Sequence, residues 1–184
     1  GTGALAIFLR RLLQLDITTS DYDDQEIKDN IAYNCKINRI IPPLPHVKHT
    51  WGDAFPIASP NWDLVIASDI LLFCVEGVME FCKWARVCDS DMIMPEKVIL
   101  EDVKQYPNLI KTLTFLLTTY QPAGNVNTSS HNEQDGGLPY PAFLMSWRRR
   151  IGKDDESLFF KGCEDAGLLV RHLGSRVYCI SLRD

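Results

Sequence analysis

Residues 1–24, GTGALAIFLRRLLQLDITTSDYDD, contain the pattern that decides the fold class. Apolar residues recur at helical spacing over residues 4–13, and residues 14–21 then form a short run typical of a β-strand that ends in acid. Gly1 and Gly3 precede the helix, and such a glycine pair normally closes a turn that an earlier strand has opened. We therefore expect a strand upstream of Gly1, so that the first strand of the sheet is missing from this chain.

The alternation of strand and helix patterns continues through the first half of the chain. Helical spacing over residues 23–38 is followed by predicted strands at residues 46–51 and 62–68 and by a predicted helix at residues 75–88. The strand at residues 62–68, WDLVIAS, is a continuous apolar run of the kind that strands show when they are buried on both faces. Alternating strands and helices imply βαβ units and a mostly parallel sheet in a Rossmann-like α/β fold.

The second half departs from this rhythm. Residues 101–120 predict a helix that is interrupted near Pro107, and residues 121–139 are polar and aperiodic, which predicts a flexible insertion. The remaining predicted elements are a strand at residues 142–147, a helix at residues 154–167, and strands at residues 168–173 and 176–182. Because only a short turn at Gly174-Ser175 joins the last two strands, we expect an antiparallel last strand in the otherwise parallel sheet.

Composition limits the classes of protein that remain. The chain has 184 residues, of which 46% are hydrophobic and 23% charged, and this predicts one globular domain over residues 1–184. The net charge of −5 disfavours a nucleic acid partner, since phosphate contacts require a basic surface. No run approaches the roughly 20 apolar residues of a membrane span, so we expect no membrane partner.

The six cysteines are scattered through apolar segments, without a C-x-x-C pair or a histidine cluster at the spacing of metal ligands. This distribution is typical of reduced core thiols in an intracellular protein, and it predicts no metal. We expect a cytoplasmic protein, with the nucleus as the alternative compartment.

Ligands of open α/β sheets bind beyond the carboxyl ends of the strands, so the residues directly after each predicted strand are candidates for a site. These residues are Asp21 after the first strand, Trp51 and Asp53 after the second, and Ser68 and Asp69 after the third. Gly1 and Gly3 would let the backbone approach a ligand at a helix N-terminus. An acid that closes a strand about 20 residues after a glycine turn is placed to bind a ribose diol, which points to Asp21.

Four segments, in this order and spacing, resemble the seven-strand S-adenosylmethionine-dependent methyltransferases: GTGALAIFL, TTSDYDDQEIKDNIAYN, TWGD and WDLVIASDILL. The nearest resemblance is to the family 16 protein-lysine methyltransferases, including members once labelled nicotinamide N-methyltransferase-like, and it covers nearly the whole chain. In that family the glycine turn reads E-x-G-x-G-T-G, of which Gly1-Thr2-Gly3 would be the end. The missing strand would then lie in the middle of the sheet, between the strands at residues 15–20 and 62–68.

The resemblance implies S-adenosyl-L-methionine as the cofactor and a protein as the substrate. The implied cofactor-binding residues are Gly1, Gly3, Asp21, Trp51, Asp53 and Ser68. Asp21 would bind the ribose hydroxyls, while Trp51 would pack against the adenine and Asp53 would accept a hydrogen bond from its exocyclic amine. Ser68 would supply a backbone contact near the cofactor.

Asp69 is the implied catalytic residue, facing the site of methyl transfer. The family pattern there is D-x-x-Y, whereas this chain has Asp69-Ile70-Leu71-Leu72. Leu72 can neither donate a hydrogen bond nor offer an aromatic face to an ammonium group. Methyl transfer from a sulfonium is an in-line displacement that needs no metal, and Asp69 would orient a lysine or terminal amine of the protein substrate.

Simpler roles stand beside these assignments. Asp21 is also suited to cap the helix that follows it, Trp51 to fill the core, and Asp69 to cap the next predicted helix. Two further functions remain open besides protein N-methylation. One is a catalytically inactive, methyltransferase-like interaction module, and the other is a small-molecule N-methyltransferase.

Overall fold

The computed structural model describes residues 2–68, 104–122, 137–146 and 153–183. The chain forms two compact units, Gly1–Pro56 and Ile57–Asp184, which are described here one after the other. The single domain over residues 1–184 stays a prediction. The predicted helix at residues 75–88 and most of the predicted insertion at residues 121–139 lie outside the described residues.

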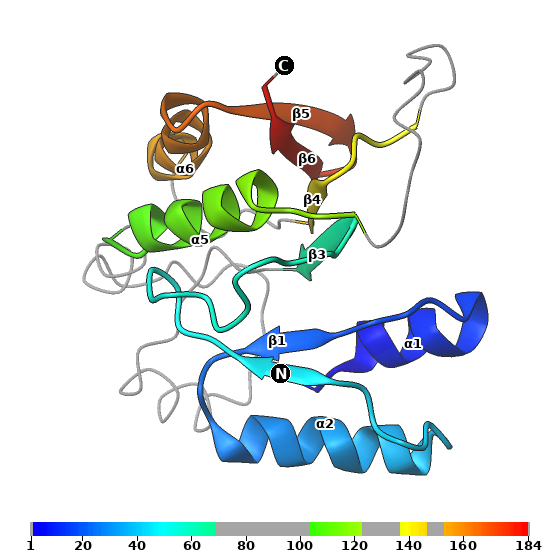
Figure 1. Cartoon of the computed structure of the whole chain (residues 1–184). Coiled ribbons are helices and arrows are strands. Elements are labelled where there is room, and N and C mark those ends of the chain that lie inside the picture. Colours follow the sequence, from blue (N-terminus) through cyan, green and yellow to red (C-terminus); the bar gives the residue numbers. More distant parts are fainter. Residues whose placement is uncertain (1, 69–103, 123–136, 147–152, 184) are drawn as a thin grey trace, which may run out of the picture. The chain divides into compact units, whose positions relative to one another are not determined.

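The first unit contains a parallel βαβ arrangement preceded by a helix (Figure 1). Its elements are α1 (Ala4–Leu13), β1 (Thr19–Asp21), α2 (Gln25–Ile37) and β2 (His46–Lys48). Strands β1 and β2 are parallel, with Thr19 opposite His46 and Asp21 opposite Lys48. Both helices are confirmed, but both strands are shorter than predicted, since residues 14–18 and 49–51 lie outside the ladder. Gln14 ends α1 in a left-handed conformation, and a turn beginning at Thr50 ends the extended run after β2.

Helices α1 and α2 pack against each other around a small apolar core. Ile7, Ile31, Cys35 and Leu44 are buried together in this core. Gly3 adopts a φ of 69° directly before α1, and a Cβ there would lie only 3.2 Å from Cγ2 of Ile31. Glycine is therefore needed at position 3 both for its positive φ and for the close approach to α2.

The second unit is built on a four-stranded sheet with the order β3-β4-β6-β5. Its strands are β3 (Leu64–Ser68), β4 (Ala142–Ser146), β5 (Leu168–Gly174) and β6 (Val177–Leu182), and its helices are α5 (Tyr106–Thr118) and α6 (Lys153–Asp165). β3 and β4 are parallel, whereas β6 runs antiparallel to both β4 and β5. β6 is thus the reversed strand among those described. The predicted Rossmann-like α/β fold with an antiparallel last strand is confirmed.

A two-residue turn forms the β5–β6 hairpin. Its central residues, Ser175 and Arg176, both have positive φ values, of 44° and 64°. Two successive positive φ values are typical of a type I′ turn, which suits the twist of antiparallel strands. The turn is therefore centred one residue later than the predicted Gly174-Ser175.

Helix α5 begins where the sequence predicted an interruption. Pro107 lies in the first turn of α5, so it opens the helix instead of breaking it. A proline is tolerated there because the N–H groups of the first turn have no acceptor within the helix. The regular helix thus begins only at Tyr106, after a turn at residue 105, and residues 101–103 of the predicted helix lie outside the described residues.

One face of the four-stranded sheet is buried against the helices. The side chains of Phe143, Met145 and Ile180 are almost completely buried, and Phe159 of α6 is buried as well. On the same face, the ring of Tyr178 lies 4.5 Å from that of Phe160 of α6, measured between centroids. The alternation of side chains along the strands therefore directs this set toward α5 and α6.

Strand β3 is an outer strand of this sheet among the described strands, and the predicted burial on both faces does not extend to Ile66. The side chain of Ile66, at the centre of β3, is 42% exposed. A continuous apolar run indicates a preference for burial, but it does not state which segments will pack on each face of the strand.

The described cysteines agree with the prediction of reduced core thiols. Cys35, Cys163 and Cys179 are buried and form no disulfide. Burial raises the pKa of Cys163 to about 12, which keeps it a neutral thiol. Within the described residues, no helix is long and apolar enough to cross a membrane.

Candidate functional site

The carboxyl ends of β1 and β2 bring the sequence-predicted residues of the first unit to one edge. Asp21 is the last residue of β1, and its backbone oxygen accepts a hydrogen bond of 2.9 Å from the N–H of His49, just past β2. Its carboxylate oxygen Oδ1 accepts a second bond, also of 2.9 Å, from the N–H of Tyr22. These two bonds fix the direction in which the chain leaves β1, and with it the position of the Asp21 side chain.

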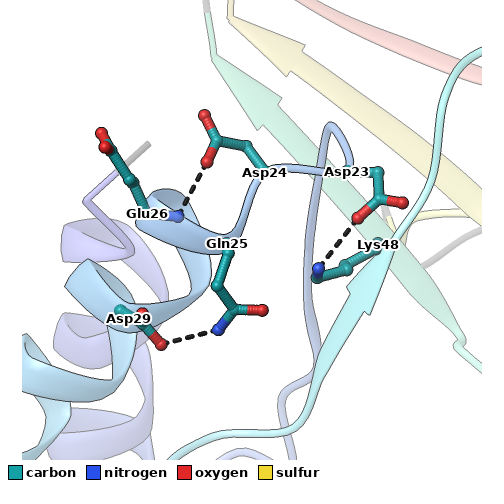
Figure 2. Close-up of polar contacts among 6 residues, drawn as sticks. All are labelled: Asp23, Asp24, Gln25, Glu26, Asp29 and Lys48. Atoms are coloured by element: carbon teal, nitrogen blue, oxygen red, sulfur yellow. Dashed lines mark hydrogen bonds and ion pairs between the residues drawn. The ribbon is translucent and has the colours of Figure 1, made fainter.

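Helix α2 takes its cap from another acid. Asp24 is the N-cap residue of α2, and its carboxylate accepts a hydrogen bond of 2.7 Å from the N–H of Glu26 (Figure 2). Its extended backbone, with φ of −128° and ψ of 125°, is the conformation expected at an N-cap. The simpler role considered for Asp21, capping the following helix, is therefore filled by Asp24.

The loop between β1 and α2 is also tied to β2. Lys48 lies opposite Asp21 in the strand register, and its Nζ forms an ion pair of 2.9 Å with Asp23 (Figure 2). Both side chains are partly exposed, at 33% for Lys48 and 64% for Asp23, so the pair adds little stability. The contact sets the position of this loop beside the carboxyl end of β2.

The segment Trp51-Gly52-Asp53 forms a tight turn just beyond β2. The N–H of Asp53 donates to the backbone oxygen of Thr50 at 3.1 Å, and Gly52 has a φ of 87°. A positive φ at the third position of a turn favours glycine. Trp51 is half-buried and Asp53 is exposed, and the turn follows His49, whose N–H bonds to the last residue of β1.

His49 contributes to the site through its backbone, which sequence reasoning missed. Its side chain is buried and packs on Phe55, with ring centroids 4.6 Å apart. Burial lowers the pKa of His49, and the negative charge of Asp53 opposes this shift. A backbone N–H is present in every residue except proline, so no residue type could have indicated the bond to Asp21.

The other predicted site residues have different outcomes. Gly3 lies in the first unit at the N-terminus of α1, where its φ of 69° directs the chain into the helix. Ser68 is the last residue of β3 in the second unit and lies opposite Ser146 of β4. Gly1 and Asp69 lie outside the described residues.

A metal centre finds no support in the part of the chain that the structure describes. No group of three or more histidine, cysteine, aspartate or glutamate side chains there is placed to hold a metal ion.

The parallel β1-α2-β2 unit, together with a sheet whose last strand is reversed, defines a Rossmann-like α/β protein. The candidate site lies where such proteins bind their ligands, beyond the carboxyl ends of the strands. No family model matches the chain, and no curated protein matches it. Among solved structures, a methyltransferase from Pyrococcus furiosus is similar, with a TM-score of 0.49 and 8% sequence identity. The similarity covers 96% of this chain and 66% of the Pyrococcus furiosus protein. This chain therefore spans just under two thirds of the length of that protein.

Proposed function

We propose that this chain is an S-adenosyl-L-methionine-dependent methyltransferase that modifies a lysine or terminal amine of a protein substrate. The observation that best supports this proposal is that the carboxylates of Asp21 and Asp24 have different hydrogen-bond partners. Asp24 caps α2, whereas Asp21 lies at the end of β1, where its carboxylate accepts a hydrogen bond from the N–H of Tyr22.

The residues at this edge suit a nucleoside. A carboxylate has two oxygens and can accept hydrogen bonds from both hydroxyls of a ribose, and such charge-assisted bonds are short and strong. The Tyr22 N–H holds Oδ1 of Asp21 in a fixed position, so the carboxylate is oriented before a ligand arrives. In the proposal, the indole of Trp51 packs against the adenine and Asp53 accepts from its exocyclic amine.

When bound, S-adenosyl-L-methionine would supply an electrophilic methyl group on its sulfonium. The protein's contribution is then to hold the acceptor amine in line and to exclude water. We assign to Ser68 a backbone contact with the cofactor and to Asp69 the orientation of a neutral amine, stabilising the charge that develops on nitrogen. Gly1 and Gly3 would line the cofactor beside the N-terminus of α1.

The test follows a labelled methyl group from S-adenosyl-L-methionine. The chain is incubated with the labelled cofactor and a cell protein extract, and separately with small amines. Label on a protein that resists removal as a methyl ester would support N-methylation of protein. Label on small amines alone would indicate a small-molecule enzyme. Absence of cofactor binding, with capture of a protein partner, would contradict the proposal and favour an interaction module.

A further inference from the structure

His49 contacts two parts of the first unit that lie far apart in the sequence. Its N–H donates to the backbone oxygen of Asp21 at 2.9 Å, which joins the residue just past β2 to the last residue of β1. Its ring packs on the ring of Phe55, with centroids 4.6 Å apart and ring planes at 57°. His49 and Phe55 flank residues 50–54, so their contact closes this segment into a loop, here called the Trp51 loop.

The Trp51 loop is also ordered from within. The N–H of Asp53 donates to the backbone oxygen of Thr50 at 3.1 Å, and Gly52 has a φ of 87°. This turn fixes the path of the loop, but a turn alone does not fix where the loop lies relative to β1. His49 supplies that placement, because its backbone is bonded to Asp21 and its ring holds the far end of the loop.

The surroundings of the His49 ring suit packing. The side chain is only 8% exposed, and burial lowers its pKa from 6.5, while the negative charge of Asp53 opposes this shift. The ring is therefore neutral at pH 7, and a neutral ring at this distance from Phe55 makes a favourable aromatic contact. A phenylalanine at position 49 keeps such a contact, whereas an alanine removes it.

We propose that His49 is a positioning residue for the adenosine end of the cofactor. Its backbone holds Asp21, which the proposed function assigns to the ribose. Its ring holds the loop that carries Trp51 and Asp53, which are assigned to the adenine. Groups that bind two parts of one nucleoside must be held at a fixed separation by the residues behind them. The inference rests on the proposed function, since it concerns how the same site is held.

The experiment measures binding to the full chain by isothermal titration calorimetry. One ligand is S-adenosyl-L-homocysteine, which is the cofactor without its transferable methyl group. The other is the same molecule with purine in place of adenine, so that it lacks the exocyclic amine. The unmodified chain should prefer the first ligand, because Asp53 accepts a hydrogen bond from that amine.

His49→Ala deletes the ring and keeps the N–H that bonds to Asp21. It should raise the dissociation constant for S-adenosyl-L-homocysteine by about tenfold, because the side chains of Trp51 and Asp53 must then be ordered on binding. The preference over the purine analogue should shrink as well, since Asp53 is no longer held in line with the amine. His49→Phe restores a ring against Phe55 and should recover most of the affinity and of the preference.

His46→Ala is the matched control, because it removes a histidine ring from β2 itself, opposite Thr19. It should leave the preference for the adenine ligand unchanged. Circular dichroism shows whether each variant folds. If His49→Ala does not fold, Phe55→Ala removes the same ring contact from the other side and should have the same effects on both ligands.

The inference is overturned if the folded alanine variant binds both ligands as the unmodified chain does. It is also overturned if both affinities fall equally, because a general loss of structure leaves the preference for the amine unchanged. Binding by His49→Phe that is as weak as binding by His49→Ala would show that the ring contact does not hold the loop. Failure of the unmodified chain to bind S-adenosyl-L-homocysteine, or to prefer it over the purine analogue, would instead contradict the proposed function itself.

Discussion

The carboxylate of Asp24 accepts a hydrogen bond of 2.7 Å from the backbone N–H of Glu26, and this contact makes Asp24 the residue that opens α2. Asp21, three residues earlier, bonds instead to the N–H of Tyr22 at the end of β1. Two acids in one short loop therefore have separate roles. One stabilises a helix, and the other is the residue that the proposal assigns to the ribose.

Asp24→Ala is expected to lower the free energy of unfolding by about 1 kcal/mol, because the N–H of Glu26 loses its acceptor at the helix end. Asp24→Asn keeps an oxygen acceptor and should lose less. Urea denaturation followed by circular dichroism measures both. A larger loss of stability in Asp21→Ala than in Asp24→Ala would show that the cap has been assigned to the wrong residue.

Asp21→Ala is expected to weaken binding of S-adenosyl-L-methionine by about 1.5 to 3 kcal/mol, because the ribose hydroxyls lose charge-assisted acceptors. Isothermal titration calorimetry measures the affinity. Asp23→Ala is the matched control, since it removes the same charge two residues away and its carboxylate contacts Lys48. Equal weakening in both variants would indicate a general charge effect and remove Asp21 from the site.

The helices and the antiparallel pairing of the last two strands followed from the sequence pattern, whereas the ends of the strands did not. Residues 4–13 and 25–37 form helices because their apolar positions meet one small core. β1 begins only at Thr19, whose N–H donates to the backbone oxygen of Pro45. Pro45 lies 26 residues from Thr19 along the chain, so short-range sequence patterns do not indicate this bond.

The candidate site was predictable at the level of strand ends but not at the level of individual contacts. The predicted parallel sheet placed Asp21 and Trp51 near the carboxyl ends of neighbouring strands, and in the structure Asp21 is the last residue of β1. The run Asp21-Tyr22-Asp23-Asp24 offers three acids, and only the backbone path decides which one caps α2. For the exposed Ile66, the apolar run indicated a buried strand, while exposure depends on what packs on that face of the sheet.

The lowered pKa of His46 predicts that the free energy of unfolding falls in acid. Its Nδ1 lies 3.0 Å from Oγ1 of Thr19, while its Nε2 is buried without a hydrogen-bond partner among the described residues. Burial lowers the pKa of His46 from 6.5. The positive charges of Lys28 and Lys48 lower it further, and Asp21 opposes them.

Because the unfolded chain takes up this proton near pH 6.5 and the folded chain only at lower pH, the stability from His46 is complete above that pH. It is lost as the pH falls through the lowered pKa. The urea concentration at the unfolding midpoint, measured from above pH 6.5 down into acid, should decline as the pH falls. His46→Asn should reduce the slope of this midpoint against pH. The same measurement on His49→Asn gives the contribution of His49 to this pH dependence, because its pKa is also lowered by burial. An unchanged slope in His46→Asn would contradict the assignment.

The close approach of Gly162 in α6 to Ile110 in α5 predicts that substitutions at these two positions have coupled effects on the free energy of unfolding. A Cβ at position 162 would lie 2.6 Å from Cδ1 of Ile110, a distance at which one of the two must move. Replacing glycine by alanine inside a helix normally stabilises it by about 0.8 to 1 kcal/mol, whereas overpacking costs about 1 to 3 kcal/mol. Gly162→Ala alone is therefore expected to be neutral or destabilising.

Ile110→Val removes the Cδ1 atom that the new methyl group would meet, so it provides the matched background. In the Ile110→Val chain, Gly162→Ala should recover the full helix gain of about 1 kcal/mol. A double-mutant cycle of unfolding free energies then yields a favourable coupling between the two substitutions. If Gly162→Ala changes the stability equally in both backgrounds, the close approach of α5 and α6 at this position does not limit the side chain at 162.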